Sequence, residues 1–188
     1  MIRVLIPIAE GSEELEAVTM IDLFRRADFA VTVAGLAAGP VRASRDTVIV
    51  PDARMDEAAG LSFDLIALPG GLPGARRLAD SEALAGLLRR QHDERRWLAA
   101  ICAAPQVLAR HGLLSGRRAT SFPGALEGFD DIEVVDEPVV VDGHIVTSRG
   151  PGTAMDFALA LIELCAGRDT HDRVEEGLQR PDSQRRAR

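Results

Sequence analysis

Hydrophobic residues in this 188-residue chain follow two alternating patterns. Continuous apolar runs, typical of buried strands, are separated by segments in which apolar positions recur every three or four residues, as on one face of a helix. Because strands and helices alternate, we expect parallel β-α-β units and a three-layer α/β fold with a mainly parallel central sheet. The expected strands are 2–8, 29–36, 47–50, 63–68, 97–101, 119–123, 132–135, 138–141 and 145–147, and the expected helices are 12–27, 81–94, 105–110, 153–165 and 168–179.

No internal repeat or low-complexity linker divides the chain. We therefore expect one domain over residues 1–179, followed by a polar, mobile tail over residues 180–188. Ser12 is expected to cap the first helix, with Glu13 and Glu14 in its first turn.

Cys102 lies where an apolar strand turns directly into a helix. Small residues surround it, Pro105 suits the first helical turn, and Gly112 suits the helix stop. This arrangement is typical of a nucleophile elbow. A helix N-terminus favours negative charge, so we expect the thiol of Cys102 to ionise more easily than a free thiol. The alternative is that Cys102 is a small buried core residue.

Functional residues of a parallel sheet gather at the carboxyl ends of its strands. Three loops qualify here: residues 9–16, residues 69–75 and the elbow. No phosphate-binding motif contains Gly70 and Gly71, so we expect these glycines to bring backbone N–H donors to a small pocket. Glu16 lies one turn into the helix that starts at this pocket, and burial would raise its pKa. Such a carboxyl can transfer a proton or hydrogen-bond a thiolate.

The remaining acids, histidines and second cysteine carry weaker signals. Glu10, Glu13 and Glu14 are expected to face solvent or serve the helix start, and Cys165 to belong to the core. No histidine has a catalytic motif, which argues against a cysteine–histidine protease triad. Surface positions are expected for His92, His111, His144 and His171.

The net charge of −7 and the pI of about 5.1 argue against nucleic acid or an anionic membrane as the main partner. Two cysteines without ligand spacing indicate neither a metal site nor a disulfide framework, and fit a reducing cytoplasm. The N-terminus has no signal-peptide pattern, and no apolar run is long enough to span a bilayer.

Five motifs resemble the ThiJ/PfpI superfamily, most closely its YajL and Parkinsonism-associated deglycase branch. The motifs occur in the order found in that family and cover nearly the whole chain. They are AEGSEELEAV at 9–18, SRD at 44–46, LPGG at 68–71, AAICAAP at 99–105 and TSRGPGT at 147–153.

The resemblance implies a flavodoxin-like fold and a homodimer. It implies that Cys102 is the reactive elbow cysteine, that Glu16 pairs with it, and that Gly70 and Gly71 supply backbone donors. Further positions that it places near the pocket or the dimer interface are Arg45, Ser148, Arg149, Gly150, Pro151 and Gly152, with Asp22 supporting them from the first helix.

The chain departs from part of the family at Phe122, where some members carry a histidine near the cysteine. This difference argues against histidine-assisted catalysis and leaves Glu16 as the acid/base candidate. Ala43 and Val50 stand where the animal relative has cysteines, so redox regulation through those positions is not expected here.

The leading functional hypothesis is a cofactor-independent enzyme acting on glyoxal, methylglyoxal or their protein and nucleotide adducts. Cys102 would form a hemithioacetal, Glu16 would move protons, and the N–H groups of Gly71 and Ala103 would bind the oxyanion. The substrate is expected to be small, with no metal or cofactor. The alternative is an oxidative-stress sensor or redox-dependent chaperone that uses oxidation of Cys102 without turnover.

Overall fold

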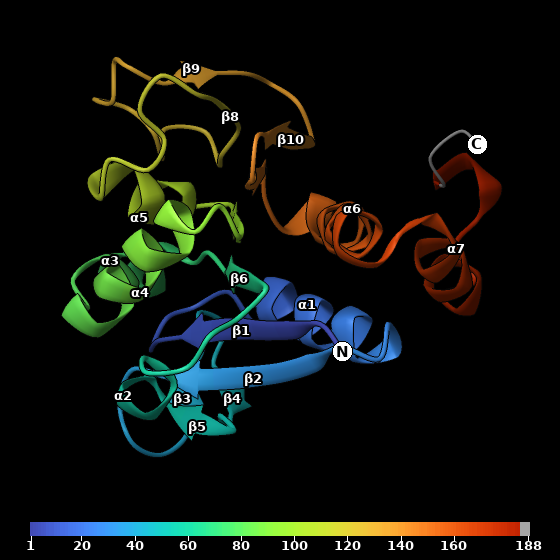
Figure 1. Cartoon of the computed structure of the whole chain (residues 1–188), viewed down its shortest axis with the longest axis horizontal. Coiled ribbons are helices and arrows are strands. Elements are labelled where there is room, and N and C mark those ends of the chain that lie inside the picture. The colour runs from blue at the N-terminus through green and yellow to red at the C-terminus, as the bar shows by residue number, and fades with distance from the viewer. Residues whose placement is uncertain (185–188) are drawn as a thin grey trace.

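A seven-stranded sheet forms the centre of the computed structural model, which describes residues 1–184 (Figure 1). The strand order is β10-β11-β7-β6-β1-β2-β5, and every pairing is parallel except that of the edge strand β10 with β11. The strands are β1 (Arg3–Ile8), β2 (Ala30–Gly35), β5 (Ala53–Arg54), β6 (Leu65–Leu68), β7 (Trp97–Ile101), β10 (Val139–Asp142) and β11 (Ile145–Ser148).

Helices cover both faces of this sheet, with α3, α4 and α5 on one side and α1, α6 and α7 on the other (Figure 1). Because both faces are covered, the central strands are apolar throughout, and all four residues of β6 are buried. The helices are α1 (Glu14–Arg26), α3 (Leu72–Ala79), α4 (Glu82–Asp93), α5 (Pro105–Arg110), α6 (Ala154–Ala166) and α7 (Arg168–Gly177). The predicted mainly parallel, three-layer α/β fold is therefore confirmed.

Short elements complete the fold. They are α2 (Met55–Ala58), the antiparallel pair β3 (Val41–Arg42) and β4 (Val48–Ile49), the parallel pair β8 (Arg118–Ala119) and β9 (Glu133–Val134), and the 3-10 turns η1 (Pro151–Thr153) and η2 (Asp182–Gln184).

The strand order positions the site. The chain runs outward from β1 to β2 on one side, and from β6 through β7 to β11 on the other. Such a reversal of direction leaves a crevice at the carboxyl ends of the strands, where ligands bind in doubly wound folds. The loops after β1, β6 and β7 all end there.

Two local predictions were wrong. Helix α3 begins inside the expected loop 69–75. A helix is possible there because Pro73 lies in its first turn, where a missing N–H is tolerated. Ser12 does not cap α1: the helix begins after Glu13, and the buried Ser12 hydroxyl accepts the N–H of Ala9 at 3.0 Å instead.

Arg180, the first residue of the expected tail, bonds Asp156 of α6 through its guanidinium at 2.7 Å and lies 3.5 Å from a Glu175 oxygen. Residues 185–188 of that tail lie outside the described residues. No helix within the described part of the chain is both long and apolar enough to cross a membrane.

Candidate active site

Cys102 forms a sharp turn between β7 and α5. Its φ angle is +63°, a conformation that non-glycine residues rarely adopt. The backbone is fixed on both sides, because the N–H of Cys102 donates to the Ser148 carbonyl at 2.9 Å and its own carbonyl accepts the Phe122 N–H at 2.8 Å. The predicted elbow is therefore present, and 8% of Cys102 remains exposed, at the floor of a cleft.

Glu16 is fully buried in the first turn of α1. Its Oε2 accepts the N–H of Gly70 at 2.7 Å, whereas Oε1 has no hydrogen-bond partner among the described residues. Burial raises the pKa of Glu16 to about 7, against hydrogen bonds from Gly70 and Cys102 that favour the carboxylate. The raised pKa expected from the sequence is thus found, and Glu16 can exchange a proton near neutral pH.

The expected easy ionisation of Cys102 is not found. Burial, together with repulsion from the Glu16 carboxylate, raises the pKa of the thiol to about 12, while the N–H groups of Gly71 and Ala103 act in the opposite direction. Burial and the carboxylate beside the sulfur outweigh the effect of the helix N-terminus. The Glu16 carboxylate raises the pKa of the thiol, whereas the hydrogen bond from Cys102 lowers the pKa of Glu16, so the protonation of each group depends on the other.

Gly70 and Gly71 have different tasks. The N–H of Gly70 donates to Glu16 and is therefore not free to bind an oxyanion, contrary to the prediction. The position also has no room for a side chain, because a Cβ there would lie 2.9 Å from Glu16 Oε2. Gly71 has φ +82° and packs against the Gly11–Glu13 turn. The N–H groups of Gly71 and Ala103 are the ones directed at the sulfur.

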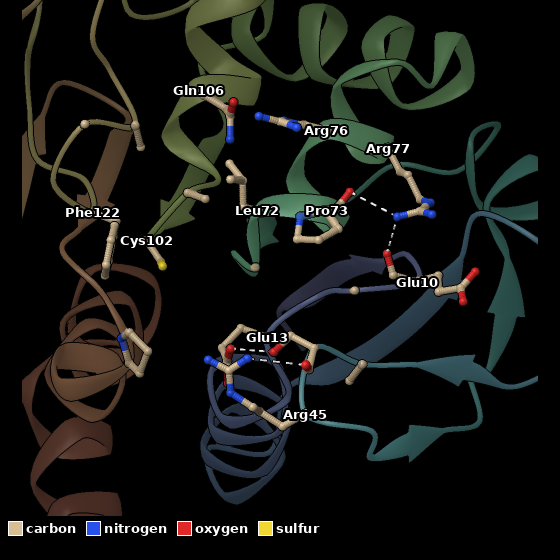
Figure 2. A pocket seen from close by; sticks show the side chains of 18 of the residues that line it. Glu10, Glu13, Arg45, Leu72, Pro73, Arg76, Arg77, Cys102, Gln106 and Phe122 are labelled. Carbon is tan, nitrogen blue, oxygen red and sulfur yellow. Dashed lines mark hydrogen bonds between the residues drawn. The ribbon is translucent and has the colours of Figure 1, made fainter.

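The cleft above Cys102 has a volume of about 910 Å³, which is far more than a small dicarbonyl fills (Figure 2). The expectation of a pocket with little room is therefore wrong, because α3, α5 and the 122–129 segment form walls rather than tight turns alone. Its lining residues are Glu10, Gly11, Glu13, Arg42, Ala43, Ser44, Arg45, Gly71, Leu72, Pro73, Arg76, Arg77, Cys102, Ala103, Gln106, Phe122, Pro123, Gly124, Ala125, Glu127, Phe129 and Pro151.

The residues expected near the pocket separate into two groups. Arg45 and Pro151 line the cleft, whereas Ser148 is buried and hydrogen-bonds the Pro138 carbonyl at 2.8 Å and the Thr153 hydroxyl at 2.7 Å. Arg149 pairs with Asp136 at 2.5 Å, outside the cleft.

Asp22 is exposed and pairs with Arg26 at 2.6 Å. Its expected supporting role beside the pocket or the dimer interface stays a prediction.

Glu13 and Glu14 do more than start a helix. The Ser44 hydroxyl donates to Glu13 at 2.6 Å and to Glu14 at 2.9 Å, and the Arg45 N–H also donates to Glu14 at 2.9 Å. These carboxylates tie the Ser44–Thr47 loop to α1 and shape one wall of the cleft.

No histidine of the described chain lines the cleft, where Phe122 is half exposed. His92 Nδ1 lies 3.1 Å from His144 Nε2, and burial lowers the pKa of His111. The surface expectation fails for His171, which is 4% exposed and lies 2.8 Å from Asp172. Cys165 is only partly buried against the core, rather than within it.

Three cleft residues carried no motif signal. Arg76 and Arg77 lie on α3, the helix missed from the sequence, and Gln106 lies on α5. The apolar positions Leu72, Ala75 and Leu78 recur at helical spacing, and this is the signal that could have placed both arginines at the site.

Comparisons with known proteins agree with this geometry. Residues 2–164 match the DJ-1/PfpI family. The chain is 46% identical over 179 residues to protein DJ-1 homolog B of Arabidopsis thaliana, covering 94% of this chain and 40% of that protein. It therefore spans less than half of that longer relative.

Two further relatives are similar over most of both chains. Glutathione-independent glyoxalase DJR-1.2 of Caenorhabditis elegans is 34% identical over 161 residues, covering 84% of this chain and 85% of the relative. The crystal structure of Drosophila melanogaster DJ-1beta superposes with a TM-score of 0.90 at 43% identity, covering 94% of this chain and 96% of that one. With this similarity along its length, the elbow cysteine and the predicted motifs, the chain belongs to the DJ-1/PfpI family.

Proposed function

We propose that this chain is a cofactor-independent, cysteine-dependent glyoxalase III-type enzyme or deglycase, acting on methylglyoxal, glyoxal or their protein and nucleotide adducts. The observation that carries the proposal is the fully buried Glu16 carboxyl, with a pKa of about 7, beside the thiol of Cys102 at the floor of a cleft. A related protein named a glutathione-independent glyoxalase supports it.

In the first step, the sulfur of Cys102 adds to the aldehyde carbon. Glu16 accepts the thiol proton as the C–S bond forms, so that no free thiolate has to accumulate at a thiol pKa of about 12, and the aldehyde oxygen becomes an alkoxide that is then protonated. The N–H groups of Gly71 and Ala103, already directed at the sulfur, are suited to stabilise that oxyanion. The product of this step is a hemithioacetal.

In the second step, the proton on the hemithioacetal carbon moves to the neighbouring ketone carbon through an enediol, giving a thioester of Cys102. Glu16 is the acid/base group for this transfer, since its Oε1 has no competing hydrogen bond among the described residues. Water then hydrolyses the thioester and regenerates the thiol. The sum for methylglyoxal is addition of one water to give lactate.

The test is consumption of methylglyoxal without glutathione, with lactate as product. Wild type should turn over, Cys102→Ser should not, and Glu16→Gln should retain the fold but lose most activity. Cys165→Ala is the matched cysteine control and should remain active. Stoichiometric consumption by wild type, stopping after one equivalent, would contradict the proposal.

The same measurement distinguishes the proposed enzyme from the alternative, a redox sensor or chaperone that uses oxidation of Cys102 without turnover. Peroxide reacts with thiolate, so the raised pKa of Cys102 gives less support to this function. A homodimer, a cytoplasmic location and a domain boundary near residue 179 remain part of the proposal.

A further inference from the structure

Arg76 is an unengaged cation at the edge of the cleft. Within residues 1–184, no carboxylate lies within ion-pair distance of its guanidinium, and it makes no hydrogen bond. Its neighbours differ: Arg77 donates to the Glu10 carbonyl at 3.1 Å, and Arg110 pairs with Asp80 at 2.9 Å. The charge of Arg76 is therefore available to a ligand.

Gln106 provides a second, independent feature. Its Nε2 is buried and has no hydrogen-bond partner among the described residues, which is unfavourable for an amide donor. Helices α3 and α5 pack together, and Figure 2 shows Gln106 and Arg76 extending from them at the same end of the cleft. An acceptor placed there would satisfy the amide and the guanidinium together.

Among the residues that line the cleft, arginines outnumber carboxylates. The cleft carboxylates are Glu10, Glu13 and Glu127, and Glu13 accepts the Ser44 hydroxyl at the opposite wall. Four arginines line the same cleft, although the whole chain has a net charge of −7. A concave surface concentrates such a local field and favours ligands of opposite charge.

We propose that Arg76 and Gln106 bind an anionic oxygen group, a carboxylate or a phosphate, on a dicarbonyl substrate whose aldehyde carbon lies at Cys102. This inference rests on the proposed function and narrows its substrate class. A planar guanidinium fits two oxygens of such a group, and the amide of Gln106 supplies a further donor. The 910 Å³ volume accommodates a substrate longer than methylglyoxal.

The turnover test compares methylglyoxal with 4,5-dioxopentanoate, which has the same reacting group and a terminal carboxylate; its product would be 2-hydroxyglutarate. Arg76→Gln should lower kcat/KM for the anionic substrate about three- to tenfold relative to methylglyoxal, mainly through KM, and less at high salt. Gln106→Leu should also lower kcat/KM for the anionic substrate relative to methylglyoxal. Arg89→Gln, on the exposed side of α4, is the matched charge control and should not. An equal effect of Arg76→Gln on both substrates would overturn the inference.

A binding test does not depend on turnover. Inorganic phosphate and acetate, titrated separately, should each produce a saturable shift of the Gln106 side-chain amide signal in NMR spectra, weakened at least threefold by Arg76→Gln but not by Arg89→Gln. Response to one anion alone would identify the preferred group. Absence of both shifts would overturn the inference, whereas shifts without turnover of either dicarbonyl would remove the proposed function and keep the anion site.

Discussion

A Cβ atom on Gly70 would lie only 2.6 Å from the Cβ of Cys102. Real Cβ contacts are not this short, so the elbow and the Gly70 backbone fit together only because position 70 has no side chain. The same glycine holds Glu16 through its N–H. One backbone position thus sets the separation of the two proposed catalytic side chains.

Gly70→Ala should lower the free energy of unfolding by about 2–3 kcal/mol, because overpacking must displace Cys102 or Glu16. Activity per folded molecule should fall as well. Gly86→Ala is the control: it lies inside α4 with open space around it, and should stabilise the protein by about 0.5–1 kcal/mol. Chemical denaturation measures both, and equal stabilities for the two variants would contradict the packing argument.

Glu16 should make stability depend on pH. Its pKa is about 7 in the folded protein against an ordinary value of 4.5, so the folded state binds more protons between these values. The resulting stabilisation is present below about pH 4.5 and is lost as pH rises through 7. Relative to Glu16→Gln, the free energy of unfolding should fall by about 3 kcal/mol across that range. Parallel pH profiles for the two proteins would show that the pKa of Glu16 is not raised.

Arg180 should contribute to stability although it lies near the chain end. Its side chain is 10% exposed and contacts Asp156 and Glu175, so Arg180→Ala leaves the nearly buried carboxylate of Glu175 and the partly buried one of Asp156 with fewer partners. The variant should lose about 1–3 kcal/mol. Arg173→Ala is the control, since its pair with Asp28 is exposed and should change stability by about 0.5 kcal/mol or less. Identical thermal unfolding of both variants would indicate that the Arg180 contacts do not persist in solution.

Cys165 should be dispensable for chemistry. It packs against the edge of the core, and burial raises the pKa of its thiol to about 12, with the charge of Asp64 acting in the same direction. Cys165→Ala should cost about 1 kcal/mol and leave turnover per folded molecule unchanged. If the fully folded variant no longer turned over methylglyoxal, Cys165 rather than Cys102 would be the reactive cysteine.

Much of the fold could be predicted because the central strands are continuous apolar runs, as in β1, β6 and β7. Cys102 and Glu16 could be proposed because each follows such a strand at the carboxyl edge. Helix α3 was missed since Pro73 and Gly74 usually mark loops.

Other features depend on contacts between distant segments, which no local pattern encodes. The pKa of Cys102 is set by burial and by Glu16 rather than by its own helix. The breadth of the cleft and the unpartnered state of Arg76 are likewise visible only when α3 and α5 pack together.

The bond between Gly70 and Glu16 joins positions 54 residues apart, and it bridges segments that the pairing of β1 with β6 brings together. The carboxyl therefore lies beside the thiol of Cys102 only where these strands are paired. Opening of the sheet at β6 would separate the proposed acid/base group from the sulfur, so activity would report on the integrity of the centre of the sheet.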